Sequence, residues 1–140
     1  MSPPHRELTR QQRAALIGWH FGNGESLVPK DVAVMTGLSL YNALALLGRL
    51  KACLDLVLLS GRWALGGTAH PRTGLNSQQR AAVVAVLLAQ HGEVYSPELA
   101  GAFGMTCQGM NAMLRSLSQV LPIYEPPAGT WLVCQMREEA

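Results

Sequence analysis

The chain has 140 residues, of which 49% are hydrophobic and 14% are charged. This composition is typical of a globular protein and excludes a disordered chain. Its apolar runs are too short to cross a bilayer and residues 1–10 lack a signal-peptide core, so we expect a cytoplasmic protein with no membrane segment. The net charge of +2 permits binding to nucleic acid but does not by itself indicate it.

The residues that most often carry catalysis or bind metals form no known pattern. Cys53, Cys107 and Cys134 are an odd number without CxxC spacing, which argues against a disulfide framework and a zinc site, and the four histidines show no ligand spacing. The chain has no GxxxxGK, HExxH or GxSxG motif. We therefore expect no enzyme, no metal and no cofactor. Cys107 is expected to be a small buried residue, although a redox-sensing role stays open.

The sequence contains an internal repeat. The segment LTRQQRAA at 8–15 returns as LNSQQRAA at 75–82, and the same offset aligns Gly37 with Gly104 and Leu47 with Leu114. Over 8–50 and 75–117, 11 of 43 aligned positions are identical by direct count. We interpret this as a duplication, so the chain is expected to contain two units of one fold.

The first unit is predicted to span residues 8–65, after a flexible arm at 1–7. Thr9 and Gln12 have the spacing of a capping box, and Pro29 suits the first turn of a second helix. The pattern predicts helices over about 10–22, 29–36 and 39–52, with a turn at Gly37, then a strand–turn–strand hairpin over 54–65.

A linker at 66–74, GGTAHPRTG, is too rich in Gly, Pro and Thr to sustain a regular element. The second unit is predicted at 75–134, followed by a frayed tail at 135–140. Its first helix is expected over about 77–90 and its third over about 106–119. Its second helix is expected to begin at Ser96, which would cap it, and a second hairpin is expected over 121–133. The predicted fold class is thus mainly α with small β-hairpins (α+β), in two tandem units.

The stretch TCQGMNAMLRSL at 106–117 has the pattern of the last helix of a helix-turn-helix. Thr106 can cap the helix, and Met110, Met113, Leu114 and Leu117 make one apolar face. Gly104 and Met105 supply the preceding turn. With the order helix, helix, helix, hairpin, this stretch resembles the winged helix-turn-helix regulators, such as the MarR-like group. The resemblance covers about 8–65 and 75–133, nearly the whole chain.

The resemblance implies double-stranded DNA as the partner, with the third helix of a unit in the major groove and the hairpin, the wing, on the flanking backbone. Gln and Asn side chains can pair with adenine edges and Arg with guanine. The residues it implies are Thr106, Gln108, Asn111 and Arg115 in the second unit, and Ser39, Tyr41, Asn42, Arg49, Arg62 and Lys30 in the first. Each of them could equally be an ordinary solvated or packing residue, and Trp63 and Trp131 are expected to pack rather than bind.

The first unit departs from this pattern, because Leu40, Leu44 and Ala45 stand where a reading helix is usually polar. A helix that is apolar nearly all round should be buried on more than one side. We therefore expect the Leu40/Leu44 face to be covered by the second unit, by another copy in a homodimer or by a protein partner. This leaves the second unit as the better candidate reader.

Two functions follow from the sequence. One is a sequence-specific transcriptional regulator of a phage, plasmid or mobile element. The other is a winged-helix adaptor or inhibitor that binds a protein. A basic stripe joining Arg115, Arg62, Arg49 and Lys30 would favour DNA, and scattered charges beside exposed leucines would favour a protein.

Overall fold

A computed structural model describes residues 7–67, 70–71 and 73–134. We call 7–67 the first half and 73–134 the second half. The first half contains α1 (Arg10–Gly22), α2 (Pro29–Thr36), α3 (Leu40–Leu54), β1 (Leu56–Leu59) and β2 (Arg62–Leu65). The second half contains α4 (Ser77–His91), β3 (Glu93–Tyr95), α5 (Ser96–Phe103), α6 (Cys107–Leu117), β4 (Ile123–Tyr124) and β5 (Thr130–Val133).

The described chain is mainly helical with two small antiparallel sheets, which confirms the predicted α+β class. The helices of the two halves form three corresponding pairs: α1 with α4, α2 with α5 and α3 with α6. Within each pair, the two helices begin 67 residues apart, which is the offset of the sequence repeat. The predicted arm, apart from Glu7, and the predicted tail lie outside the described residues, as do positions 68, 69 and 72 of the linker.

Local side-chain bonds fix where the first helix of each half begins. In the capping box of α1, the Gln12 N–H donates to Thr9 Oγ1 and the Thr9 N–H donates to Gln12 Oε1, both at 3.0 Å. Asn76 and Gln79 repeat the arrangement at α4. These bonds satisfy backbone N–H groups that have no partner inside the helix, and both predicted boxes are confirmed.

Glycine residues make the turn before the third helix of each half. Gly37 ends α2 with φ +74° and Gly104 ends α5 with φ +69°, a left-handed conformation that glycine adopts without a steric penalty. Ser96 was expected to cap α5, and that prediction is wrong. Tyr95 pairs with Thr130 in the sheet and the Ser96 N–H donates to the Gly129 carbonyl at 2.7 Å, so strand β3 runs directly into the helix.

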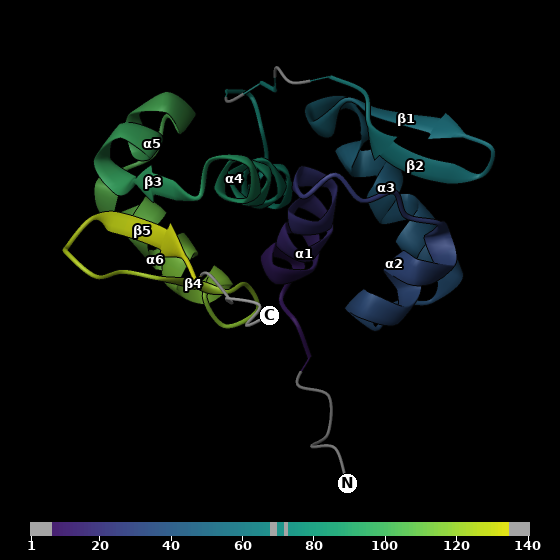
Figure 1. Ribbon diagram of the computed structural model, residues 1–140, viewed down its shortest axis with the longest axis horizontal. Helices are drawn as coiled ribbons and strands as arrows, with labels where there is room; N and C mark the ends of the chain where they lie inside the picture. Colours follow the sequence, from purple (N-terminus) through teal and green to yellow (C-terminus); the bar gives the residue numbers. More distant parts are fainter. Residues whose placement is uncertain (1–6, 68–69, 72, 135–140) are drawn as a thin grey trace, which may run out of the picture.

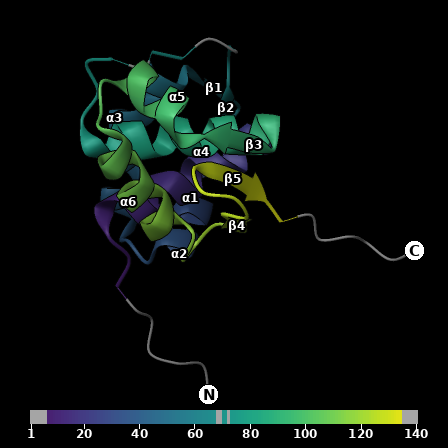
Figure 2. The same ribbon diagram turned by 90° about the vertical axis from the view of Figure 1, so that its left-hand side faces the viewer.

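The two predicted hairpins are present, and the second is widened by one strand. In the first half β1 pairs with β2, with Leu58 opposite Trp63, and Leu27 adds an isolated bridge to Trp63. In the second half the strand order is β3-β5-β4 (Figure 2), and Val94 pairs opposite Trp131. As expected, both tryptophans pack in the protein: Trp131 is buried in the core, and Trp63 is half-buried and packs against the core.

The two halves are joined through α1 and α4, which lie at the centre of the molecule (Figure 1). The α2–α3 side of the first half and the α5–α6 side of the second half lie on opposite flanks of this pair. Every residue from Ala81 to Leu88 is buried, so α4 is enclosed on all sides. A Cβ added at Gly18 would overlap the Ala82 carbonyl oxygen, and one at Gly22 would lie 2.8 Å from the Ala89 Cβ. The backbones therefore approach too closely for any larger side chain at these positions.

Two glutamines bind the halves to each other reciprocally. The Gln12 amide in α1 donates to the Ser116 carbonyl of α6 at 3.0 Å, and the Gln79 amide in α4 donates to the Arg49 carbonyl of α3 at 3.1 Å. Gln12 corresponds to Gln79 and Arg49 to Ser116 at the offset of 67 residues. The same contact is thus made twice in opposite directions, as in a symmetric dimer whose subunits have been joined in one chain.

We expect Gly18→Ala to lower the free energy of unfolding by about 1–3 kcal/mol, because the added methyl group must push α1 away from the Ala82 carbonyl. Gly48→Ala is the matched control, since Gly48 is also inside a helix but its Cβ would meet no atom within 4 Å. The control should stabilise the protein by about 0.5–1 kcal/mol. Urea unfolding of both variants measures the difference, and a Gly18→Ala protein as stable as wild type would contradict the close packing.

Candidate nucleic-acid interface

Helix α6 presents a polar outer face. The Thr106 hydroxyl oxygen accepts the Gly109 N–H at 2.9 Å and so caps the helix as predicted. The predicted apolar face is buried in the core, as Met110, Met113, Leu114 and Leu117. Gln108 and Arg115 are exposed, and their side chains make no hydrogen bond within the described part of the chain. These two side chains are therefore free to meet a ligand.

Asn111 is engaged inside the protein rather than free on the helix surface. Its Oδ1 accepts the indole N–H of the buried Trp131 at 3.3 Å, and its Nδ2 lies 3.7 Å from Cys107 Sγ. The side chain is half-buried and connects α6 to β5. Sequence reasoning placed Asn111 among the base-contacting candidates, and it missed this contact because Trp131 lies 20 residues further along the chain.

Helix α3 carries apolar side chains where α6 carries polar ones. Leu40 is 55% exposed, Tyr41 80% and Leu44 45%. The corresponding residues of α6 are Cys107, Gln108 and Asn111. The expectation that the second unit covers the Leu40/Leu44 face is wrong, because the second half meets the first mainly through α1 and α4 and leaves this face open.

Of the other candidates in the first half, Ser39 and Asn42 stand at the start of α3. The Ser39 hydroxyl oxygen accepts the Asn42 N–H at 3.1 Å, the same cap that Thr106 makes in α6. Both residues are exposed. Lys30 is exposed in the first turn of α2.

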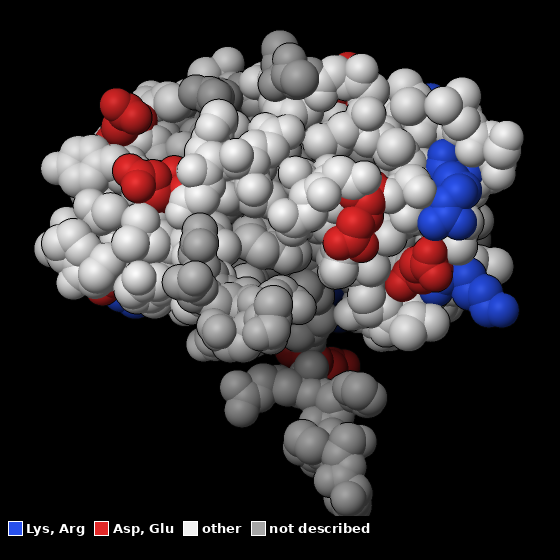
Figure 3. Space-filling view, in the orientation of Figure 1, with Lys and Arg blue, Asp and Glu red and all other residues white. Residues whose placement is uncertain are grey.

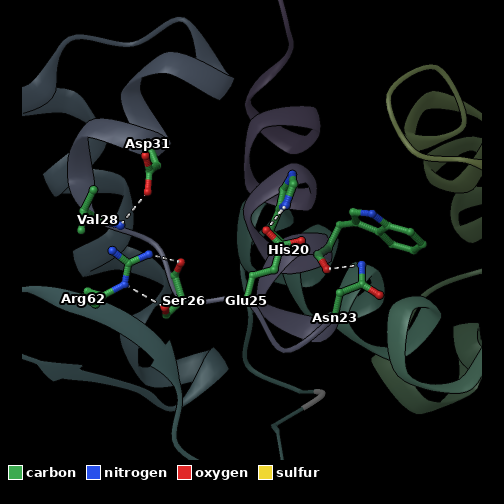
Figure 4. Close-up of polar contacts among 8 residues, drawn as sticks. His20, Asn23, Glu25, Ser26, Val28, Asp31 and Arg62 are labelled. Carbon is green, nitrogen blue, oxygen red and sulfur yellow. Dashed lines mark hydrogen bonds and ion pairs between the residues drawn. The ribbon is translucent and has the colours of Figure 1, made fainter.

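Arg62, predicted at the wing tip, is turned back against the loop between α1 and α2 (Figure 4). Its Nε donates to Ser26 Oγ at 2.9 Å and one terminal nitrogen donates to the Ser26 carbonyl at 3.0 Å. The same loop is held by Asp31, which accepts the Val28 N–H at 3.2 Å, and by His20, which lies 2.9 Å from the Glu25 carboxylate. Part of the donor capacity of Arg62 is therefore already used.

Arg49 lines a groove with Arg10 and Arg13 of α1. Sequence reasoning did not single out Arg10, and only the packing of α1 against α3 brings these arginines together. The first half has six described basic residues: Arg10, Arg13, Lys30, Arg49, Lys51 and Arg62. The second half has two, Arg80 and Arg115. On the face drawn in Figure 3, most Lys and Arg atoms accordingly lie over the side that holds α2 and the β1–β2 hairpin.

The burial of the cysteines differs from what the sequence predicted for Cys107. Cys107 is exposed at the start of α6, so the prediction of a buried residue is wrong. Its place in the helix, one residue after the cap, turns it outward rather than toward the core. Cys53 is the buried cysteine, and burial raises the pKa of its thiol to about 11.

We expect Asn111→Ala to destabilise the protein by about 1–3 kcal/mol, because the buried Trp131 indole N–H would lose its acceptor. The control Gln108→Ala removes another amide from the same helix, where it is exposed and makes no bond within the described chain, and should change stability by less than about 0.5 kcal/mol. Thermal unfolding of both variants provides the comparison. Equal effects would show that Asn111 has no structural role.

Comparison with protein-family models, with curated proteins and with solved structures found no match to this chain. Among the residues that the structure describes, no single helix is long and apolar enough to cross a membrane, and α2 and α3 reach that length only as a pair bent by 104°.

Proposed function

We propose that this chain is a tandem winged helix-turn-helix protein that binds double-stranded DNA and reads it with α6. The observation that carries the proposal is the geometry of its helix pairs. Helices α2 and α3 are bent by 104° at a break of three residues that begins with a left-handed glycine. This lies within the range of about 90–120° that is typical of the helix-turn-helix motif. Helices α5 and α6 share the same turn at Gly104.

The outer face of α6 has the chemistry that base reading needs. Gln108 lies in its first turn and Arg115 two turns later, both exposed. An amide can pair bidentately with adenine and a guanidinium with guanine, whereas a helix N-terminus can hold a phosphate. Asn111 supports this face through Trp131 and is not needed for base contact in this proposal.

Phosphate contacts would come mainly from the first half. Lys30, Lys51 and Arg49 are exposed on α2 and α3, and the second half has only Arg115 and the half-buried Arg80. Two similar halves related by a nearly symmetric contact could meet successive grooves of one duplex. In this arrangement α6 would supply sequence preference and the first half would supply much of the electrostatic affinity.

Selection from a random duplex pool tests the proposal, followed by affinity measurements at about 50 and 200 mM salt. We expect an enriched motif. Gln108→Ala should relax preference at one base pair by about 1–3 kcal/mol, and Arg115→Ala should weaken binding, both with unchanged thermal stability. Gln90→Ala, an exposed amide at the end of α4, is the control that should change neither quantity. Absence of binding at low salt, or an affinity insensitive to both α6 substitutions, would refute it.

A second candidate function is protein binding by the first half, and one observation favours it. Leu40, Tyr41 and Leu44 form an exposed apolar face at the start of α3, and Val34 of α2 is 79% exposed. The described cations do not lie on one element, and Arg62 is already bonded to Ser26. An exposed apolar face is typical of a protein-interaction site.

A photoreactive residue placed at position 41, or at the corresponding position 108 of α6, distinguishes these functions in cells. If the first half binds a protein, irradiation should give a discrete protein adduct from position 41 that is lost on Leu44→Glu. The α6 position should then give DNA adducts alone. DNA adducts from both positions would argue against a protein-binding role for the first half.

A further inference from the structure

A groove between α1, α3 and the start of α4 gathers three arginine side chains. Its volume is about 260 Å³, and its lining residues are Arg10 and Arg13 of α1, Asn42, Leu46 and Arg49 of α3, Gln78 of α4, and Leu38. Because Gln78 belongs to the second half, the groove lies where the two halves meet.

The three guanidinium groups have no counter-charge in the described part of the chain. None of the described carboxylates lines the groove, and the single ion pair among the described residues joins His20 to Glu25. Arg13 Nε is buried and makes no hydrogen bond, as is also true of Arg80 Nε in the second half. Glu7 lines a neighbouring cavity with Arg13 but forms no ion pair with it. Like charges held together without a partner repel each other, so the groove favours any anion that enters it.

The corresponding place in the second half lacks this cluster. At the offset of 67 residues, Arg10 corresponds to Ser77, Arg13 to Arg80 and Arg49 to Ser116. Only one arginine remains there, and one of its terminal nitrogens donates to the Leu75 carbonyl at 2.9 Å. The shared fold therefore does not require three arginines, and the cluster is a property of the first half alone.

We propose that this groove binds the phosphate group of a small phosphorylated molecule. Guanidinium groups pair with phosphate oxygens through two parallel hydrogen bonds, and the Asn42 and Gln78 amides can add donors. The volume is just below the usual range of ligand cavities, which suits a compact ligand. The site shares Arg49 with the DNA backbone contacts proposed above, but it does not depend on DNA reading by α6, because Arg10 and Arg13 lie on α1.

Isothermal titration calorimetry of the full chain with inorganic phosphate and with pyrophosphate tests the proposal. Both should bind, and pyrophosphate should bind more tightly because it offers more oxygens and charge. Arg10→Gln and Arg49→Gln should each weaken binding about tenfold or more, the effect of losing one charge-assisted hydrogen bond. Arg115→Gln removes the same charge from the other half and should leave the affinity unchanged. Both targeted arginines are exposed, and thermal unfolding checks that the variants remain folded.

Two results would overturn the proposal. Absent binding to wild type, or an equal loss in Arg115→Gln, would show that the groove is not a specific anion site. A duplex that displaces pyrophosphate, and that itself binds more weakly to Arg10→Gln, would assign the groove to the DNA backbone instead of a small molecule. Anion binding that persists when no DNA binds would uphold this site while the proposed function fails, so the two are separable.

Discussion

Helices α1 and α4 approach each other closely at Gly18. The Ala82 carbonyl of α4 occupies the space that a side chain at position 18 would need. One turn later, a Cβ added at Gly22 would lie 2.8 Å from the Ala89 Cβ and 2.9 Å from the Val86 Cα. This close approach lets two short helices bury each other, with α4 enclosed from Ala81 to Leu88. Dispersion and hydrophobic burial are concentrated at this contact, and the remaining elements of each half pack around it.

The central contact also explains how one fold can present two different surfaces. Because α1 and α4 join the halves, the exposed side chains of α3 and α6 are not needed for that contact and can differ. The face of α3 has become apolar, with Tyr41 and Leu44, while that of α6 is polar, with Gln108 and Arg115. In the groove beside α1, the first half likewise has Arg49 where the second has Ser116. One core can in this way carry two different surfaces.

Features set by local sequence were predictable. The capping boxes at Thr9 and Asn76 and the turns at Gly37 and Gly104 depend on neighbours within a few residues, so the helix boundaries followed from the pattern. The prediction that Ser96 caps α5 was wrong because the start of α5 depends on a residue far away in the sequence: the Ser96 N–H donates to the Gly129 carbonyl.

The candidate site was less predictable, because its key contacts join residues far apart in the chain. Asn111 looks like a reading residue until Trp131 is placed beside it, and Arg10 looks like an ordinary helix residue until α3 brings Arg49 next to it. The outward direction of Leu40 could not be derived either, since an apolar helix in sequence does not say which of its faces a neighbour covers.

Native-state hydrogen exchange tests most directly whether α1 and α4 make the two halves one cooperative unit. The slowest amides of both helices should exchange with the same opening free energy, equal to that of global unfolding, and with the same denaturant dependence. Those of the outer helices α2 and α5 should open at lower free energy. If α1 exchanged by an opening that left α4 protected, or the reverse, the halves would fold independently and the account of a shared core would be contradicted.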